Sequence, residues 1–432
     1  MKSRLGWGVL LAGAPLMAGA DDGISAGDTA WMLTATALVL FMTLPGLALF
    51  YGGLVRAKNV LSVLMQCFAI TCIVSLLWVI GLYSLAFASG GPWIGGLGKV
   101  FMAGVTTEAR NGSVPEVVFS MYQLTFAVIT PALVVGGFAE RMKFSAMLVF
   151  SALWSLLVYA PVCHWVWAPD GWLFQRGLLD FAGGTVVHIT AGVGALVAAM
   201  VLGHRQGFLH TPMMPHNMTM TVTGAGMLWV GWFGFNGGSA LAANGHAGMA
   251  VLVTHVSAAA GAVSWSIMEW VKYRKPSVLG IVTGLVAGLG TITPASGYVG
   301  PGGALLIGLI AGFVCFNATH LLKRTLKIDD SLDVFPVHGV GGIIGTLMAG
   351  FFASPALGVF SGQGYAAGMD MGRQLGVQAL GVLATAAYTG VVTLALLKIL
   401  GATMGLRVSG EAESSGLDTA EHNERGYDLG TL

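Results

Sequence analysis

The sequence predicts an all-α membrane protein that crosses the bilayer many times. Hydrophobic residues make up 55% of the 432-residue chain and charged residues only 9%, whereas about 25% of a typical soluble protein is charged. Apolar stretches recur along nearly all of residues 29–405, and about 20 apolar residues suffice for one helical span. The net charge of +1 gives no indication of a nucleic-acid partner.

Eleven spans account for these stretches, at roughly 29–54, 61–88, 116–138, 143–166, 184–203, 216–236, 247–271, 277–292, 301–323, 334–353 and 374–404. The joins that follow odd-numbered spans carry eleven Lys and Arg residues, and the other joins carry four. Cytoplasmic joins are the more basic ones. We therefore expect a multi-pass protein of the cell inner membrane, with its amino terminus in the periplasm and its carboxyl terminus in the cytoplasm.

Three segments are expected. Residues 1–20 have the form of a signal peptide, with a basic start, an apolar stretch and an Ala-Gly-Ala cleavage site; the alternative is an additional amino-terminal helix. Residues 21–406 form the eleven-helix domain. The polar, acidic residues 407–432 are either disordered or a regulatory tail at the cytoplasmic face, and polarity alone does not decide.

Glycine accounts for 65 residues, about twice its usual share. The glycines recur within the spans, where small residues let helix backbones approach closely, so we expect a tightly packed bundle. The cysteines have no metal or disulfide spacing and are expected to be small buried hydrophobic residues: Cys67, Cys72, Cys163 and Cys315. We expect neither a metal nor a cofactor.

Two histidines identify the most informative positions. His188 and His338 lie 150 residues apart, each in the pattern V-H-x-x-x-G within a predicted span. Span 1 ends ALFYGG and span 6 ends GFNGGS. Spans 1–5 and 6–10 therefore look like two copies, with span 11 left over. Because five is odd, the second copy enters from the opposite side, which makes an inverted repeat with sites near the midplane.

An ionisable side chain within a span is costly and therefore indicates function. The alternative is that backbone carbonyl groups satisfy each histidine separately. Neutral imidazole has one donor and one acceptor nitrogen, so two rings can bond to each other and still offer a polar edge to a small solute. Without a nearby carboxylate or thiolate the pair is a poor metal site.

Other polar and aromatic residues gather at the predicted outer ends. Asp180 lies eight residues before His188; it can cap the helix, bias a cation site by its charge, or bind solute directly. Tyr122 and Phe126 share one helix face, and aromatic faces attract small cations. A ring of aromatic residues with the Ser239 hydroxyl suits a cation that donates hydrogen bonds. The alternative is an interfacial aromatic belt, to which Trp232 is also assigned.

At DFAGGTVVHI the sequence resembles the ammonium transporter family (Amt/MEP/Rh), specifically its bacterial Amt branch. Further segments agree: TALVLFMTLPGLALFYGGLVRAKNV, GFAERMKFSA, GWFGFNGGSA, TPASGYVGPGGALLIG, DDSLDVFPVHGVGG and GLRVSGEAESSGLD. The resemblance covers essentially the whole mature chain. It implies an eleven-helix homotrimer with one pore in each subunit, and a transporter rather than an enzyme.

The resemblance also implies site residues. The paired pore histidines correspond to His188 and His338, and the stacked rings that close the outer mouth to Phe126 and Phe235. The external ammonium site corresponds to Trp167, Ser239 and Tyr122, with Asp180 beneath it. Tyr122 departs from the phenylalanine of a bacterial relative, and the stretch between Trp167 and Asp180 is one residue longer.

The expected mechanism is capture of ammonium outside, deprotonation, passage of ammonia and reprotonation inside, with the proton following. An Rh-like gas channel, an ammonium sensor and a membrane enzyme are the alternatives. The tail resembles the family segment that takes part in control by a PII-type signalling protein. The expected docking surface is a basic cytoplasmic rim: Arg56, Lys58, Arg141, Lys143, Arg205, Lys272, Arg274 and Lys275.

Overall fold

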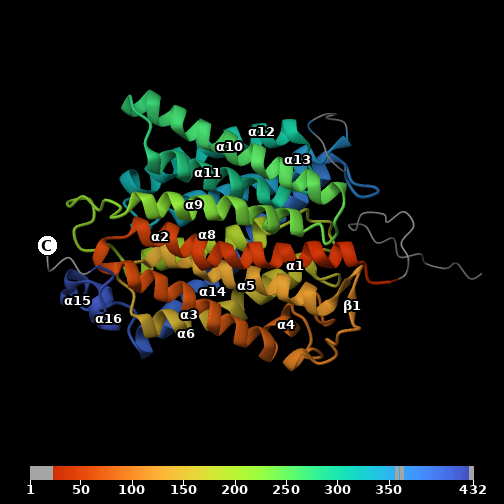
Figure 1. Ribbon diagram of the computed structural model, residues 1–432, viewed down its shortest axis with the longest axis horizontal. Coiled ribbons are helices and arrows are strands. Elements are labelled where there is room, and N and C mark those ends of the chain that lie inside the picture. Colours follow the sequence, from red (N-terminus) through yellow and green to blue (C-terminus); the bar gives the residue numbers. More distant parts are fainter. Residues whose placement is uncertain (1–22, 356–359, 361–363, 428–432) are drawn as a thin grey trace, which may run out of the picture.

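The computed structural model describes residues 23–355, 360 and 364–427 as a bundle of long helices (Figure 1). The predicted signal peptide lies outside the described residues. The helices of the first half are α1 (Ala26–Phe41), α2 (Ala48–Leu54), α3 (Val60–Leu77), α4 (Tyr83–Phe87), α5 (Glu116–Phe138), α6 (Phe144–Trp154), α7 (Ala160–Trp167) and α8 (Thr190–Leu202). Those of the second half are α9 (Met218–Trp232), α10 (Gly245–Tyr273), α11 (Val278–Ile292), α12 (Pro301–His320), α13 (Val340–Phe352), α14 (Met371–Thr403), α15 (Gly410–Ser415) and α16 (Leu417–His422).

Short segments of π-helix or 3₁₀-helix join or extend these helices. The π-helical ones are η1 (Met42–Leu47), η3 (Trp78–Leu82), η5 (Ser155–Tyr159), η6 (Gly184–Ile189), η7 (Phe233–Gly237), η9 (Leu321–Thr325) and η10 (Phe335–Gly339). The 3₁₀ segments are η2 (Ala57–Asn59), η4 (Val100–Met102) and η8 (Thr293–Ala295). A small antiparallel hairpin pairs β1 (Arg110–Asn111) with β2 (Val114–Pro115).

Within the described residues, ten helical stretches are long and apolar enough to cross a membrane. Their bounds match ten of the predicted spans to within a few residues. The remaining predicted span, 216–236, is a continuous helical stretch formed by α9 and η7. It is less apolar because it contains five threonine or asparagine residues, yet it lies beside α1 and α2 (Figure 1).

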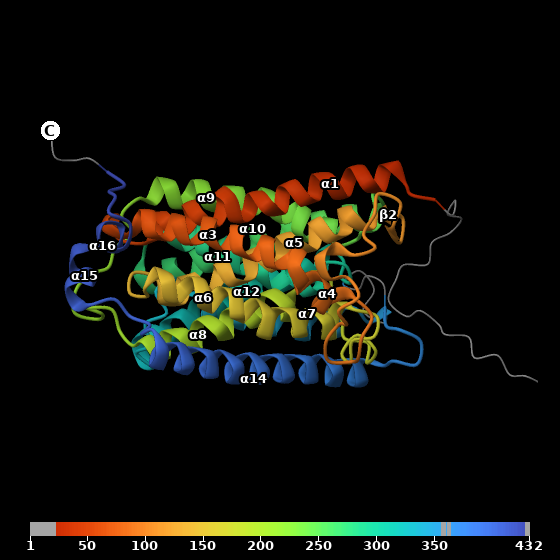
Figure 2. The ribbon, with the colours of Figure 1, turned by 90° about the horizontal axis from the view of Figure 1, so that it is seen from below.

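The bundle has central and peripheral helices. In α5, 89% of the most apolar 18-residue stretch is buried inside the bundle, whereas in α14 only 39% of the corresponding stretch is buried. Figure 2 shows α14 along one edge of the molecule, nearly parallel to its long axis. The hairpin β1–β2 lies at one end and α15 with α16 at the other (Figures 1 and 2). These ends are called the hairpin end and the tail end below.

The two halves of the chain pack reciprocally. Helix α8, which follows His188, contacts η10, and α13, which follows His338, contacts η6. Both α8 and α13 have 13 residues, and a π-helical segment precedes each. This exchange of partners agrees with the predicted inverted repeat. Three of the cysteines are buried as expected, but Cys72 is exposed on the bundle surface, so the prediction of burial is wrong for that residue.

Candidate functional site

The glycine of each V-H-x-x-x-G pattern allows the two histidine helices to cross. A Cβ atom on Gly192 would lie 2.3 Å from the Cα atom of Gly339, and one on Gly342 would lie 2.9 Å from the Cβ atom of His188. Real Cβ atoms do not approach so closely, and only glycine lacks one. Each pattern glycine therefore lies against the histidine helix of the opposite copy, and this crossing brings the histidines together.

His188 and His338 form a hydrogen-bonded pair in the middle of the bundle. Their Nδ1 atoms are 3.2 Å apart, and the rings stack with centroids 5.3 Å apart. One Nδ1 therefore donates and the other accepts. It follows that one ring has an Nε2 acceptor and the other an Nε2–H donor. Both side chains are buried, and the Nε2 atom of His188 has no partner.

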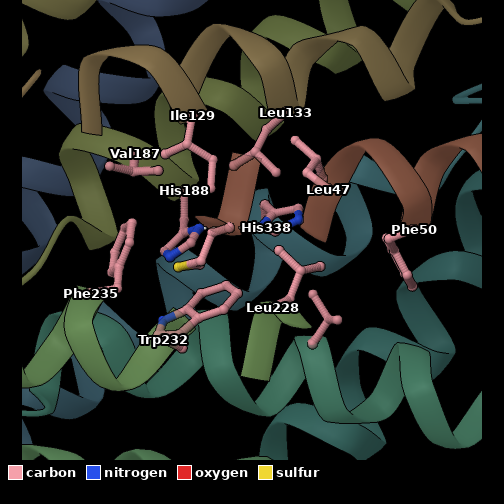
Figure 3. A pocket seen from close by; sticks show the side chains of 12 residues that line it. Leu47, Phe50, Ile129, Leu133, Val187, His188, Leu228, Trp232, Phe235 and His338 are labelled. Carbon is pink, nitrogen blue, oxygen red and sulfur yellow. Dashed lines mark hydrogen bonds between the residues drawn. The ribbon is translucent and has the colours of Figure 1, made fainter. Parts of the chain in front are cut away.

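A narrow cavity of about 10 Å³ runs beside this pair (Figure 3). That is about the space that one water-sized molecule requires. The lining is otherwise apolar: Met42, Leu47, Phe50, Ile129, Leu133, Val187, Leu228, Trp232, Phe235 and Val286. The π-helical segments η1, η6, η7 and η10 all contribute to it. Such segments are rare in proteins and are frequent at functional sites.

Trp232, which was expected in an interfacial aromatic belt, is one of the lining residues. Its ring stacks on His188, with centroids 5.6 Å apart and 16° between the planes. Its Nε1–H donates to the Thr293 hydroxyl at 2.9 Å. The assignment to the outer end is therefore wrong, because Trp232 lies at the level of the histidines (Figure 3). Its spacing of three residues before Phe235, on one helix face, was the available signal.

The predicted aromatic residues form a connected cluster on the hairpin side of His188. The rings of Phe126 and Phe235 lie 4.3 Å apart, and Phe126 meets the edge of Trp167 at 5.7 Å. Tyr122 lies 5.0 Å from Phe126, and Phe235 lies 6.1 Å from His188. Phe126 and Phe235 are almost fully buried. The two rings thus separate the histidine pair from the hairpin end.

The Tyr122 hydroxyl forms hydrogen bonds within the protein. It lies 2.9 Å and 2.8 Å from the carbonyl oxygens of Gly234 and Phe235, and 3.2 Å from the Ser239 hydroxyl. Ser239 in turn donates to the Phe235 carbonyl at 2.9 Å. Tyr122 therefore links α5 to η7 beside the Phe126–Phe235 pair. Ser239 and Trp167 are only half-buried, which leaves both accessible from the hairpin end.

The Asp180 carboxylate caps the helix that carries His188. It accepts hydrogen bonds from the backbone N–H groups of Gly183, Gly184 and Thr185 at 2.6 to 2.8 Å, and from the Thr185 hydroxyl. Its backbone carbonyl accepts the Trp167 indole N–H at 3.0 Å. Both carboxylate oxygens are used and the side chain is buried. The geometry favours capping and positioning over direct contact with solute.

A second, wider cavity of about 240 Å³ extends from His338 to the tail end. Its walls include the polar residues Tyr51, Glu269, Ser331, Lys323 and Asp333. The Lys323 ammonium lies 2.8 Å from the Asp333 carboxylate. His338 thus lines both the narrow apolar cavity and this wider, partly polar cavity, which is called the tail-end vestibule below.

The tail end is held by buried charges. Arg205 pairs with Glu140 at 2.9 Å and with Asp329 at 2.8 Å, and Arg56 also pairs with Glu140. Burial opposes ionisation of Glu140, but Arg205 and Arg56 hold the pKa of its carboxyl below the usual value. The prediction of an exposed basic rim is wrong for Arg141 and Arg205, which are buried. Lys272, Arg274 and Lys275 are exposed as expected.

Residues 407–427 form a folded segment against these charges, so disorder is wrong for this part of the tail. The Asp418 carboxylate accepts the N–H groups of Leu61 and Ser62 at 3.0 and 2.7 Å, at the start of α3. The Glu413 carboxylate lies 2.6 Å from the Arg407 guanidinium and accepts the Gln206 N–H at 2.6 Å. Both carboxylates are almost fully buried.

Known proteins share this fold. The chain matches the Ammonium Transporter Family over residues 30–427. It is 46% identical over 403 residues to the ammonium transporter of Bacillus subtilis (strain 168), which covers 93% of this chain and 98% of the relative. The crystal structure of Saccharomyces cerevisiae Mep2 superimposes with a TM-score of 0.84 at 35% identity, covering 97% of this chain and 95% of Mep2. A solved sensor Amt protein gives a TM-score of 0.85 at 31% identity, covering 92% and 98%.

Proposed function

Because the chain belongs to the Ammonium Transporter Family and is an ammonium transporter rather than an enzyme, we propose how its pore selects ammonium. Ammonium is captured at the hairpin end, which faces the periplasm, near Trp167, Tyr122 and Ser239. It loses its proton before the Phe126–Phe235 pair. Ammonia then passes His188 and His338 into the tail-end vestibule and is reprotonated there.

The observation that carries this proposal is the histidine pair beside a cavity of about 10 Å³. Such a passage has no room for the water shell of an ion, and an ion without that shell loses many kcal/mol of hydration. Ammonia has no charge to desolvate. It has both a lone pair and N–H groups, so it matches either Nε2 atom of the pair. Potassium has no proton to lose and is therefore rejected.

The test uses the purified protein in liposomes. Uptake of ammonium and membrane current are measured together, with and without a large excess of potassium. We expect uptake that potassium does not inhibit, and a current that accompanies it if the proton follows. Uptake that potassium competes away would contradict a passage for ammonia and indicate a cation channel. Uptake without any current would favour an Rh-like gas channel.

We also propose the assembly, location and partner that the family resemblance implies. Three copies form a homotrimer in the cell inner membrane, each with its own pore and with the tail end in the cytoplasm. A PII-type signalling protein binds at that end. The exposed Lys272, Arg274 and Lys275 and the docked tail support a reversible contact there.

A further inference from the structure

The repeat that contains the histidines also contains an acidic residue. Asp180 precedes His188 by eight residues, and Asp330 precedes His338 by eight residues. Both lie shortly before a π-helical segment, η6 and η10 respectively. Asp330 accepts the backbone N–H of Phe335, the first residue of η10, at 2.7 Å. Asp180 accepts the N–H of Thr185, the equivalent residue of the first copy, at 2.8 Å.

The two carboxylates differ in how fully they are satisfied. Thr185 also donates its hydroxyl to Asp180, whereas the corresponding residue Phe335 has no hydroxyl to donate. The Oδ1 atom of Asp330 is buried and has no hydrogen-bond partner, and the residue as a whole is 0% exposed. A buried carboxylate oxygen without a donor is costly when it carries charge. Asp330, in the second copy, therefore has one acceptor oxygen without a hydrogen bond, whereas both carboxylate oxygens of Asp180 accept hydrogen bonds.

The surroundings of Asp330 place its titration near neutral pH. Burial, reinforced by the nearby charge of Asp333, raises the pKa of the Asp330 carboxyl to about 7, against the opposing effects of the Phe335 N–H, Lys323 and the Val334 N–H. The other titratable or charged groups near it are Arg141 and Tyr51. Because the pKa is raised by folding, the neutral acid is the form that the fold favours. That preference is lost as the pH rises through about 7.

We propose that Asp330 is a positioning residue for His338, as Asp180 is for His188, and that its unpartnered oxygen makes this positioning respond to pH at the tail end. The proposal rests on the proposed function, because it concerns the same pore. Asp330 bonds to the start of η10, three residues before His338. Ionisation strengthens that bond and at the same time leaves a bare charge on Oδ1. The two protonation states of Asp330 therefore favour different positions of η10, the segment that carries His338.

The experiment measures initial ammonium uptake into right-side-out membrane vesicles. The luminal pH, which faces the tail end, is varied by about one and a half units on either side of 7, the Asp330 pKa. The external pH is fixed. Each variant rate is divided by the wild-type rate at the same pH, so that the changing proton gradient cancels. Asp330→Asn has nearly the same shape as the aspartate but remains neutral.

We expect Asp330→Asn to equal the wild type at the acidic limit and to diverge from it through a step centred near pH 7. Asp333→Asn and Phe335→Thr retain Asp330 but should lower the midpoint of its titration by about one pH unit, because one removes a like charge and the other adds a hydroxyl donor. Their ratios to the wild type should therefore be equal at the two pH limits and depart from that value only between about pH 6 and 7. Asp370→Asn, at an exposed carboxylate that caps the start of the peripheral helix α14, is the matched control and should give a constant ratio.

A ratio that stays constant with pH for Asp330→Asn overturns the inference even though the wild type transports. If Asp330→Asn does not assemble, the other two variants decide, and ratios that stay constant with pH in both of them overturn the inference. Absence of uptake by the wild type is a different result, because it contradicts the proposed function itself.

Discussion

At the scale of single residues, the proposed pore depends on buried polar atoms that can bind a neutral solute. The Nε2 atom of His188 is buried without a partner, beside a passage lined by apolar side chains. A buried polar atom left without a partner costs about 1–3 kcal/mol. In the proposed mechanism, passing ammonia satisfies that atom and offsets this cost.

His188→Ala removes one edge of the pair and leaves His338 without its Nδ1 partner. We expect ammonium uptake to fall by roughly tenfold, or its selectivity over potassium to fall, as the loss of about 1.4 kcal/mol predicts. Trimer assembly should survive. Uptake and potassium competition in liposomes measure the effect. His255→Ala, which changes a histidine that stacks on Trp229 outside the pore, is the control. Wild-type uptake and selectivity in His188→Ala would remove the central role of the pair.

Asp180 combines a structural and an electrostatic role. Asp180→Asn keeps an acceptor oxygen but turns an amide toward the N–H groups of Gly183, Gly184 and Thr185, so charge-assisted bonds worth about 1.5–3 kcal/mol are lost. We expect strongly reduced transport with some folded protein. Asp180→Ala should impair folding as well, because all these donors lose their partner.

The two Asp180 variants are compared by thermal stability in detergent and by uptake in liposomes. Normal uptake by purified Asp180→Asn would exclude the electrostatic part of the role. Equal stability of the alanine variant and the wild type would exclude the capping part.

At the scale of helices, the crossing of η6–α8 with η10–α13 sets the distance between the histidines. The close approach depends on residues without side chains, and packed interiors tolerate little added volume. A substitution that keeps these helices apolar can therefore still prevent the crossing. The glycines four residues after the histidines, Gly192 and Gly342, are therefore as necessary to the site geometry as the imidazoles.

Gly342→Ala tests this crossing. The new methyl group would lie 2.9 Å from both the Gly184 carbonyl oxygen and the His188 Cβ atom. Overpacking of this kind costs about 1–3 kcal/mol, and we expect lower thermal stability together with reduced uptake. Gly376→Ala in α14, where a Cβ atom meets nothing within 4 Å, is the matched control and should change neither property. A Gly342→Ala protein with wild-type transport would show that the helices can separate without cost to the pore.

At the scale of the whole molecule, the docked tail connects distant parts of the tail end. The Leu417 N–H donates to Asn59 at 2.8 Å, and Asn59 donates to Glu140 at 2.9 Å. Glu140 pairs with Arg205, which reaches Asp329 beside Asp330. A partner that displaces the tail would therefore disturb a hydrogen-bond and ion-pair network that ends at Asp329, close to the segment that carries His338.

Truncation after Leu406 should weaken binding of a PII-type partner, or uncouple its binding from uptake, while leaving the pore residues in place. Pull-down of the partner from membranes and uptake are measured in parallel. Asp418→Ala, which removes the bonds to Leu61 and Ser62 but keeps the tail, separates undocking from deletion. If binding and inhibition are both unchanged in the truncated protein, the partner acts through the loops alone.

The sequence by itself predicted the limits of ten spans to within a few residues, because apolar length is a local property. It also indicated the histidine repeat, because the same pattern occurs twice. Only the tertiary structure decided what each polar atom faces. Trp232 stacks on His188, the Tyr122 hydroxyl is taken up by backbone carbonyls, and Arg141 and Arg205 are buried. These outcomes depend on which helices cross and how closely, and that geometry arises from contacts between residues far apart in the chain.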